Sequence, residues 1–204
     1  SKIDLNQIIK NDNKIFSIFP GSRLIEINIL TPILFEFVKI MNENRKDLFF
    51  VFHSTSEYAD KLQNLINKQG FKNCISIGDD KIKAQVLKSS IFAIAKSGTI
   101  SLEICKAKVP SIIIYKMNVI NFFIVKMLVK VKFANIINIA AEQEVIPELL
   151  QSKCNPKNIF NVVNKLLDDK FALKQQVDKS TLIINDFKTE TPSKIASSVL
   201  IDHL

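Results

Sequence analysis

The 204-residue chain is long enough to bury a sizeable core, and its 47% apolar residues exclude an intrinsically disordered protein. Its net charge of +8 predicts attraction to polyanions, which include phosphorylated metabolites, anionic lipid and nucleic acid. Nucleic acid is the weakest of these candidates, because the 15 Phe and two Tyr do not form the aromatic pattern of an RNA-stacking sheet.

The first half of the chain alternates short apolar runs, typical of buried parallel strands, with helical patterns. We expect strands at 15–19, 48–53 and 75–77, and helices at 24–44, 57–69 and 80–87. Asp80 is the expected cap of the third helix, and Gly70 the residue that ends the second. Pro32 lies inside the first helix and predicts a kink or a later start.

The central unit, residues 91–115, consists of a strand at 91–95, a turn, a helix and a second strand at 111–115. Ser97, Gly98 and Thr99 form the turn, where Thr99 is expected to cap the helix. Gly98 allows the backbone to approach a ligand closely. Because a helix start presents unpaired N–H groups, this turn is a candidate site for an anion.

A second turn, Pro20-Gly21-Ser22-Arg23, follows the first expected strand. The chain has only four glycines and two arginines, so an arginine beside a glycine turn indicates bidentate binding of phosphate oxygens. The alternative is a surface arginine after a tight turn.

Residues 118–133 form an apolar segment that lysines interrupt, too short and too charged to span a bilayer. One interpretation places it in the headgroup region of an anionic membrane, and the other packs it as a core helix with solvated lysines. The expected membrane contacts are Phe122, Phe123, Lys126 and Lys130.

Over residues 135–151 we expect a loop and then a short helix. Further helices are expected from Asn155-Pro156, over 171–187 and over 192–203, the last of them capped by Thr191. The alternation of strands and helices predicts an α/β fold, a doubly wound parallel sheet with right-handed crossovers. Ligands of such sheets bind beyond the carboxyl ends of the strands, where both turns and His53 fall. We interpret His53 as a hydrogen-bonded residue at a strand end.

Three stretches, in this order, resemble lipid-A-disaccharide synthase. They are Phe19-Pro-Gly-Ser-Arg23 with Glu26, Ser97-Gly-Thr-Ile-Ser-Leu-Glu103 with Pro110 and Tyr115-Lys116, and Asn138 with Pro147-Glu148-Leu-Leu-Gln151. The resemblance runs from about residue 15 to the C-terminal helices and corresponds to the C-terminal half of that enzyme. It implies the Rossmann-like C-terminal domain of a GT-B glycosyltransferase with extra C-terminal helices. Residues 1–204 would form one UDP-sugar-binding domain with 152–204 as its helical extension, and the N-terminal acceptor domain would be absent.

The resemblance also implies transfer of a sugar from UDP-2,3-diacylglucosamine to a lipid monosaccharide 1-phosphate, forming the β-1,6 disaccharide of lipid A. The enzyme would be cytoplasmic and peripheral on the inner membrane of a Gram-negative bacterium. No metal or cofactor is expected, because the chain has no acidic Asp-x-Asp cluster. By similarity the donor would be held by Gly21, Ser22, Arg23, Ser97, Gly98, Thr99, Glu103 and Asn138.

Within this set, Gly21 to Arg23 and Ser97 to Thr99 would hold the diphosphate, and Glu103 would accept the ribose hydroxyls. Glu103 lies one residue past the capping-box position, so its carboxylate is expected to be free for a ligand. The alternatives are an ordinary first-turn acid at Glu103 and a turn asparagine at Asn138. One departure is Glu142-Gln143, where the family has Gly-Arg. Rival interpretations are another UDP-sugar GT-B transferase or epimerase, and a non-catalytic basic module that docks on membrane or nucleic acid.

Overall fold

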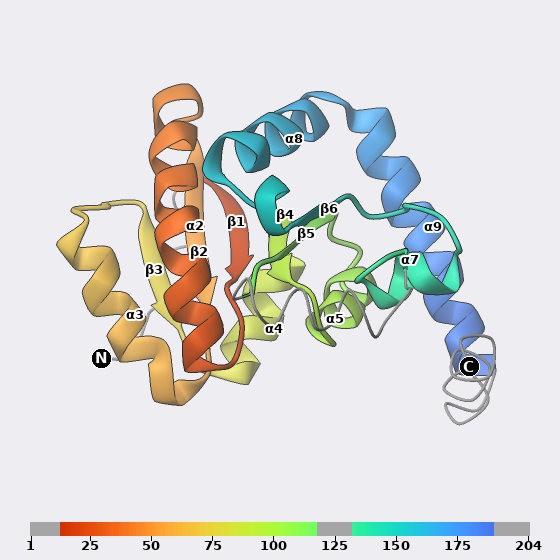
Figure 1. Cartoon of the computed structure of the whole chain (residues 1–204), viewed down its shortest axis with the longest axis horizontal. Coiled ribbons are helices and arrows are strands. Elements are labelled where there is room, and N and C mark those ends of the chain that lie inside the picture. The colour runs from red at the N-terminus through yellow and green to blue at the C-terminus, as the bar shows by residue number, and fades with distance from the viewer. Residues whose placement is uncertain (1–12, 118–131, 190–204) are drawn as a thin grey trace.

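The computed structural model describes residues 13–117 and 132–189 (Figure 1). These residues form a six-stranded sheet with every strand pair parallel, in the order β3-β2-β1-β4-β5-β6. The strands are β1 Lys14–Phe19, β2 Leu48–His53, β3 Cys74–Ile77, β4 Ser90–Lys96, β5 Ser111–Tyr115 and β6 Glu148–Leu150. The order turns back between β1 and β4, which confirms the doubly wound sheet that the sequence predicts.

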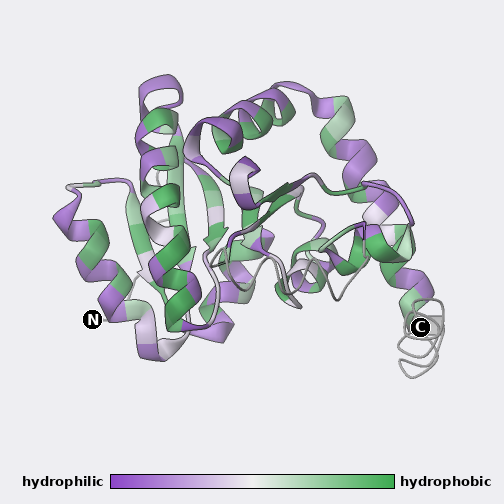
Figure 2. Cartoon of the chain, in the orientation of Figure 1, coloured by the Kyte–Doolittle hydropathy of each residue, from purple (hydrophilic) through white to green (hydrophobic). Residues whose placement is uncertain are grey.

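Helices cover both faces of the sheet, and the strands are largely apolar along their length (Figure 2). One core packs α2 (Leu24–Asn44), α3 (Ser56–Lys68) and α8 (Pro156–Asp168) on the side of Phe16 and Ile18. The opposite face carries α4 (Asp80–Lys88), α5 (Ile100–Lys106), α7 (Ile136–Ala140) and α9 (Lys170–Thr189). Burial on both sides explains why the central strands are continuous apolar runs without alternation.

The segment after Asn135 differs from the expected loop and helix. Residues expected to be loop form α7, and Glu148–Leu150 pairs with β5 as the sixth strand, followed by a 3₁₀ turn at Gln151–Lys153. The expected order, a loop and then a short helix, is therefore wrong, because the helix comes first and the end of the stretch is a strand. A strand of three residues is too short to show a period of two, and two adjacent leucines fit either structure.

Two details of the helices also differ from expectation. Asp79, and not Asp80, caps α4, because its Oδ1 accepts hydrogen bonds from Lys81 N at 2.7 Å and Ile82 N at 3.1 Å. α2 begins at Leu24 despite Pro32, so the later start is wrong. The helix expected at 192–203 with its Thr191 cap lies outside the described residues.

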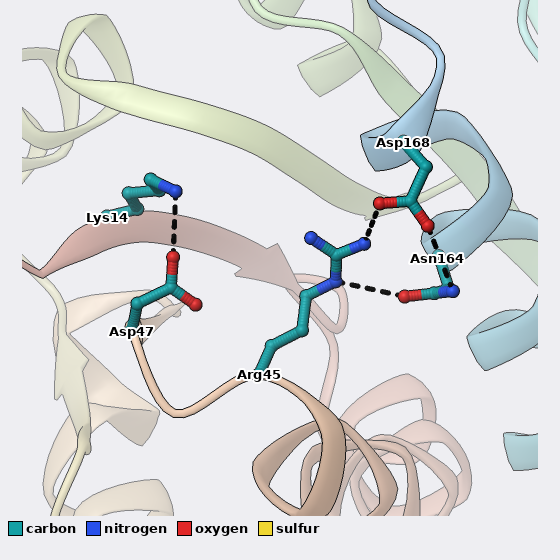
Figure 3. Close-up of polar contacts among 5 residues, drawn as sticks. All are labelled: Lys14, Arg45, Asp47, Asn164 and Asp168. Atoms are coloured by element: carbon teal, nitrogen blue, oxygen red, sulfur yellow. Dashed lines mark hydrogen bonds and ion pairs between the residues drawn. The ribbon is translucent and has the colours of Figure 1, made fainter.

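An arginine holds α8 against the end of α2 (Figure 3). Arg45 Nε donates to Asn164 Oδ1 at 2.9 Å, and its Nη2 bonds to Asp168. Close by, Lys14 at the start of β1 pairs with Asp47 at 2.8 Å. One of the two arginines thus has a structural role at the edge of the sheet where β1 and β2 begin.

α9 completes the hydrogen bonding of β5. Gln176 is 7% exposed; its Oε1 accepts from Ser111 N at 2.7 Å and its Nε2 donates to Ser111 O at 2.9 Å. β6 pairs with β5 only from Ile113 onward, so this side-chain amide takes the place of a strand beside the beginning of β5.

Candidate functional site

The segments that follow β1, β2, β3 and β4 open on one cavity of about 340 Å³ at the carboxyl edge of the sheet. This is the edge at which doubly wound sheets bind ligands, beside the point where the strand order turns back. Its lining includes Phe19, Gly21, Ser22, Glu26, His53, Ser54, Thr55, Gly78, Lys83, Lys96, Ser97, Gly98, Thr99 and Glu103.

The cavity brings together most of the residues predicted to hold a donor nucleotide. The predicted residues that line it are Gly21, Ser22, Ser97, Gly98, Thr99 and Glu103, whereas Arg23 and Asn138 do not. The two turns, more than 70 residues apart in the chain, therefore face one space, as the sequence predicts.

Arg23 stands at the rim next to Ser22. Its side chain is 80% exposed, and its nearest acidic contact is a long one, 4.0 Å from Nη1 to Glu26 Oε1. Among residues 13–117 and 132–189 the guanidinium therefore has no closer acidic partner to hold it away from an anion at the cavity mouth.

The carboxylate of Glu26 lies within the β1–α2 turn and binds its backbone amides. Its Oε2 accepts hydrogen bonds from Ser22 N at 3.1 Å and Arg23 N at 3.4 Å, and its Oε1 pairs with Lys96 Nζ at 2.9 Å. Burial by itself raises the pKa of Glu26, but the Lys96 ammonium and the backbone N–H groups outweigh it and lower that pKa. Two amides of the turn are thus already paired with a carboxylate of the protein.

The β4–α5 turn leaves room for a close neighbour. A Cβ added to Gly98 would find, among the atoms of the described residues, only Lys96 O at 4.0 Å, so these residues leave the space beside it open. Thr99 is the N-cap of α5, but its hydroxyl makes no capping bond, contrary to expectation. Ser97 Oγ donates to Ala134 O at 2.6 Å, so its proton is used within the protein.

Glu103 is paired and not free, which differs from the expectation. Its Oε2 lies 3.1 Å from Lys83 Nζ, and the same ammonium lies 3.0 Å from Asp80 Oδ1. Burial lowers the pKa of Lys83, but the hydrogen bonds that its ammonium donates to Asp80 and Glu103 outweigh burial and raise this pKa. Because the Glu103 side chain is 49% exposed, its other oxygen can still accept from a ligand hydroxyl.

Asn138 is fully buried, and protein groups occupy its hydrogen-bonding positions. Its Nδ2 donates to Ile146 O at 2.7 Å and Glu148 Oε1 at 2.8 Å, and its Oδ1 accepts from Val145 N and Ile146 N. It therefore shapes the loop before β6 and has no capacity left for a ligand.

In the same loop Glu142, at the position where the resemblance implies a glycine, has a φ of 52°. A non-glycine residue is strained in this left-handed region, so the departure noted in the sequence has a conformational cost.

Five further residues line the cavity although the sequence did not point to them as ligand contacts: His53, Ser54, Thr55, Lys83 and Lys96. His53 was expected to be satisfied, but only its Nε2 has a partner, and Nδ1 is buried without one. Their position in the chain was the available signal: His53 and Lys96 end parallel strands, Ser54 and Thr55 follow one directly, and Lys83 lies in the first turn of α4.

The predicted membrane contacts Phe122, Phe123, Lys126 and Lys130 lie outside the described residues. Among residues 13–117 and 132–189, no helix combines the length and the apolar character needed to cross a bilayer.

A sequence model of the family described as lipid-A-disaccharide synthetase matches residues 2–200. The lipid-A-disaccharide synthase of Sulfurihydrogenibium sp. is 34% identical over 176 residues, which are 82% of this chain and 45% of the relative. The chain thus spans about half the length of the curated relatives it matches.

Two solved structures share the fold at low sequence identity. The C-terminal domain of a Group 1 family glycosyl transferase from Francisella tularensis superimposes with a TM-score of 0.57 at 13% identity, over 91% of this chain and 93% of that one. S. aureus MnaA, solved in a co-structure with UDP, gives a TM-score of 0.59 at 17% identity, over 94% of this chain and 50% of its own. These likenesses confirm the Rossmann-like fold of a GT-B C-terminal domain.

Proposed function

The chain belongs to the lipid-A-disaccharide synthase family, and from that membership we propose that it forms the donor-binding part of a glycosyltransferase of lipid A biosynthesis. The donor is UDP-2,3-diacylglucosamine, and the acceptor is a lipid monosaccharide 1-phosphate. Residues 1–204 act as one UDP-sugar-binding domain, with 152–204 as its helical extension.

The proposal depends above all on the meeting of two turns, Gly21 to Arg23 and Ser97 to Thr99, at one cavity. A diphosphate fits beside Gly98, where the atoms of the described residues leave space. Lys96 lines the same space and Arg23 stands at its rim, so both cations are available to the phosphate oxygens. Glu103 then accepts from the ribose hydroxyls through its exposed oxygen.

Charge stabilisation is the catalytic contribution we assign to this cavity. When the sugar leaves its carrier, negative charge grows on the UDP diphosphate, and preorganised cations and N–H groups stabilise that charge. Arg23 and Lys96 supply the cations, and Asn138 serves the site indirectly by holding the loop before β6.

Transfer also needs a base for the acceptor hydroxyl, with a pKa near the working pH. His53 does not suit this role, because burial, with a smaller contribution from Lys83, lowers its pKa to about 3. We place the base in the part of the relatives that this chain does not span.

Titration of the 204-residue chain with UDP by calorimetry tests the proposal. We expect saturable heat with a dissociation constant of roughly 1 μM to 1 mM, the usual range for substrates of enzymes. We also expect no sugar transfer by this chain alone. Absence of saturable heat contradicts the donor-binding role, whereas turnover by this chain alone contradicts only the division of labour between the two halves.

The cytoplasmic, peripheral placement on the inner membrane follows from the lipid substrates and from the basic, apolar segment at 118–133. Vesicles that contain anionic lipid are expected to co-sediment with the chain. Replacing Phe122 and Phe123 by serine is expected to weaken that binding at least about tenfold, since two large apolar side chains are lost from the interface. Equal sedimentation of the two proteins contradicts membrane docking through these residues.

A further inference from the structure

A buried chain of hydrogen bonds runs beneath the cavity floor across three strands. Ser90 Oγ, at the start of β4, donates to Val86 O at 2.9 Å. Ser17 Oγ, in β1, lies 2.7 Å from Ser90 Oγ and 2.8 Å from His53 Nε2, at the end of β2. Ser17, His53 and Ser90 are each at most 9% exposed, so water does not share these bonds.

The direction of this chain fixes the tautomer of His53. Ser90 gives its single proton to a carbonyl, so it must accept from Ser17. Ser17 has then given its own proton to Ser90, and its oxygen must accept from His53 Nε2–H. The imidazole therefore carries its proton on Nε2, and its Nδ1 is a bare hydrogen-bond acceptor.

That acceptor has no partner among the described residues. His53 Nδ1 is buried and unpaired, and so are the hydroxyl oxygens of Ser54 and Thr55, the next two residues, all three of which line the cavity. Burial lowers the pKa of His53 to about 3, which keeps the ring neutral and Nδ1 an acceptor at physiological pH. Phe19 stacks on the ring with a centroid distance of 4.2 Å and holds its plane.

Buried polar groups of a native protein are paired in the great majority of cases, so three adjacent exceptions in one cavity point to a bound partner. That partner must offer an N–H or O–H to Nδ1, and it can accept from the two hydroxyls. The imide edge of uracil has this pattern, with one N–H between two carbonyl oxygens.

We propose that His53 Nδ1 accepts a hydrogen bond from N3–H of the donor's uracil ring, while Ser54 and Thr55 donate to its carbonyl oxygens. The proposal rests on the UDP-sugar-binding function and adds the residues that select the base. Ser17 and Ser90 are positioning residues, because they hold the tautomer without touching the ligand. Cytosine has a lone pair at N3, which would face the lone pair of Nδ1 in a desolvated site, and it is rejected.

Calorimetry of the unaltered chain with UDP, CDP and N3-methyl-UDP tests base selection. We expect UDP to bind at least about tenfold more tightly than either analogue, because each analogue leaves Nδ1 without a donor. Equal affinity for UDP and CDP overturns the base-selecting role while the donor-binding function stands. Absence of UDP binding contradicts the donor-binding function itself.

Two substitutions distinguish the role of His53 Nε2 as a donor from the role of Nδ1 as an acceptor. Gln in His53→Gln can still donate to Ser17 but offers no acceptor near Nδ1, so we expect the preference for UDP over CDP to fall to about threefold or less. Asn in His53→Asn places an amide oxygen near Nδ1, and we expect it to restore at least half of the preference on a logarithmic scale. A preference in His53→Gln equal to that of the unaltered chain overturns the proposal.

Ser76→Ala is the matched control, because Ser76 is a buried serine with an unpaired hydroxyl that does not line the cavity. It is expected to leave the preference for UDP unchanged. Thermal unfolding of each variant checks that it is folded, and the analogue titrations on the unaltered chain decide the question if His53→Gln does not fold.

Discussion

Replacing Gly21 by alanine is expected to weaken UDP binding at least about 100-fold and to lower the free energy of unfolding by about 2–4 kcal/mol. Gly21 has a φ of +121°, and a Cβ there would lie 2.5 Å from Glu26 Oε2 and 2.7 Å from Glu26 Cβ. Rotation of the Glu26 side chain can move the carboxylate, but Cβ is fixed to α2. The turn must therefore shift, and the Glu26 carboxylate loses the hydrogen bonds that it accepts from the turn amides and from Lys96.

Gly70→Ala is the matched control for this result. Gly70 also has a positive φ, +73°, but a Cβ there meets no atom within 4 Å, and the residue does not line the cavity. This variant is expected to show the conformational cost alone, about 1 kcal/mol, with UDP binding unchanged. Urea unfolding and calorimetry measure the two quantities. Unaltered UDP affinity in Gly21→Ala would show that the β1–α2 turn does not shape the nucleotide site.

Replacing Lys96 by methionine is expected to weaken UDP binding about 10- to 100-fold, because the diphosphate loses a cation in a partly buried site. The Lys96 side chain is only 21% exposed and that of Glu26 15%, so the variant also leaves a mostly buried carboxylate without its cation. Lys39→Met is the control, since Lys39 forms an exposed ion pair with Glu36 at 2.7 Å. This variant is expected to change neither UDP affinity nor the free energy of unfolding measurably.

The same variant predicts a pH dependence of stability. Burial raises the pKa of Glu26, but Lys96 and two backbone amides outweigh it and hold this pKa below its usual value of 4.5. The ionised carboxylate therefore stabilises the folded protein above about pH 4.5, and that contribution is lost as the pH falls through the lowered pKa. We expect Lys96→Met to cost about 2 kcal/mol at pH 7 and progressively less below pH 4.5. Urea unfolding across this range measures it; a difference independent of pH would contradict the assignment.

The sheet and its ligand edge were predictable because burial on both faces leaves a plain signature in the sequence. Continuous apolar runs such as 48–53 and 111–115 have no other common explanation at that length, and the turns after them are brought to one edge by parallel pairing. β6 has only three residues and no period, so its place depends on pairing with β5, which the sequence alone does not display.

The position of the candidate site was predictable from the sequence, but the hydrogen-bond partners of its side chains were less so. Gly21 and Gly98 are found from local rules, but which group each polar atom bonds to depends on residues distant in the chain. Glu26 accepts a hydrogen bond from the Ser22 amide of the β1–α2 turn, and Lys83 of α4 pairs with Glu103 of α5, which was expected to be free. The orphaned Nδ1 of His53 follows from Ser17 and Ser90, 36 and 37 residues away, which no local pattern connects.

The side-chain amide of Gln176, which is hydrogen-bonded to Ser111, also affects the tendency of the protein to aggregate. β6 is so short that the first residues of β5 would otherwise present a bare sheet edge, the feature through which β proteins stick together. Because Gln176 of α9 covers that edge, α9 protects the protein from aggregation through β5. A shortened form of the chain that ends before residue 176 would lose this protection while keeping every residue of the cavity.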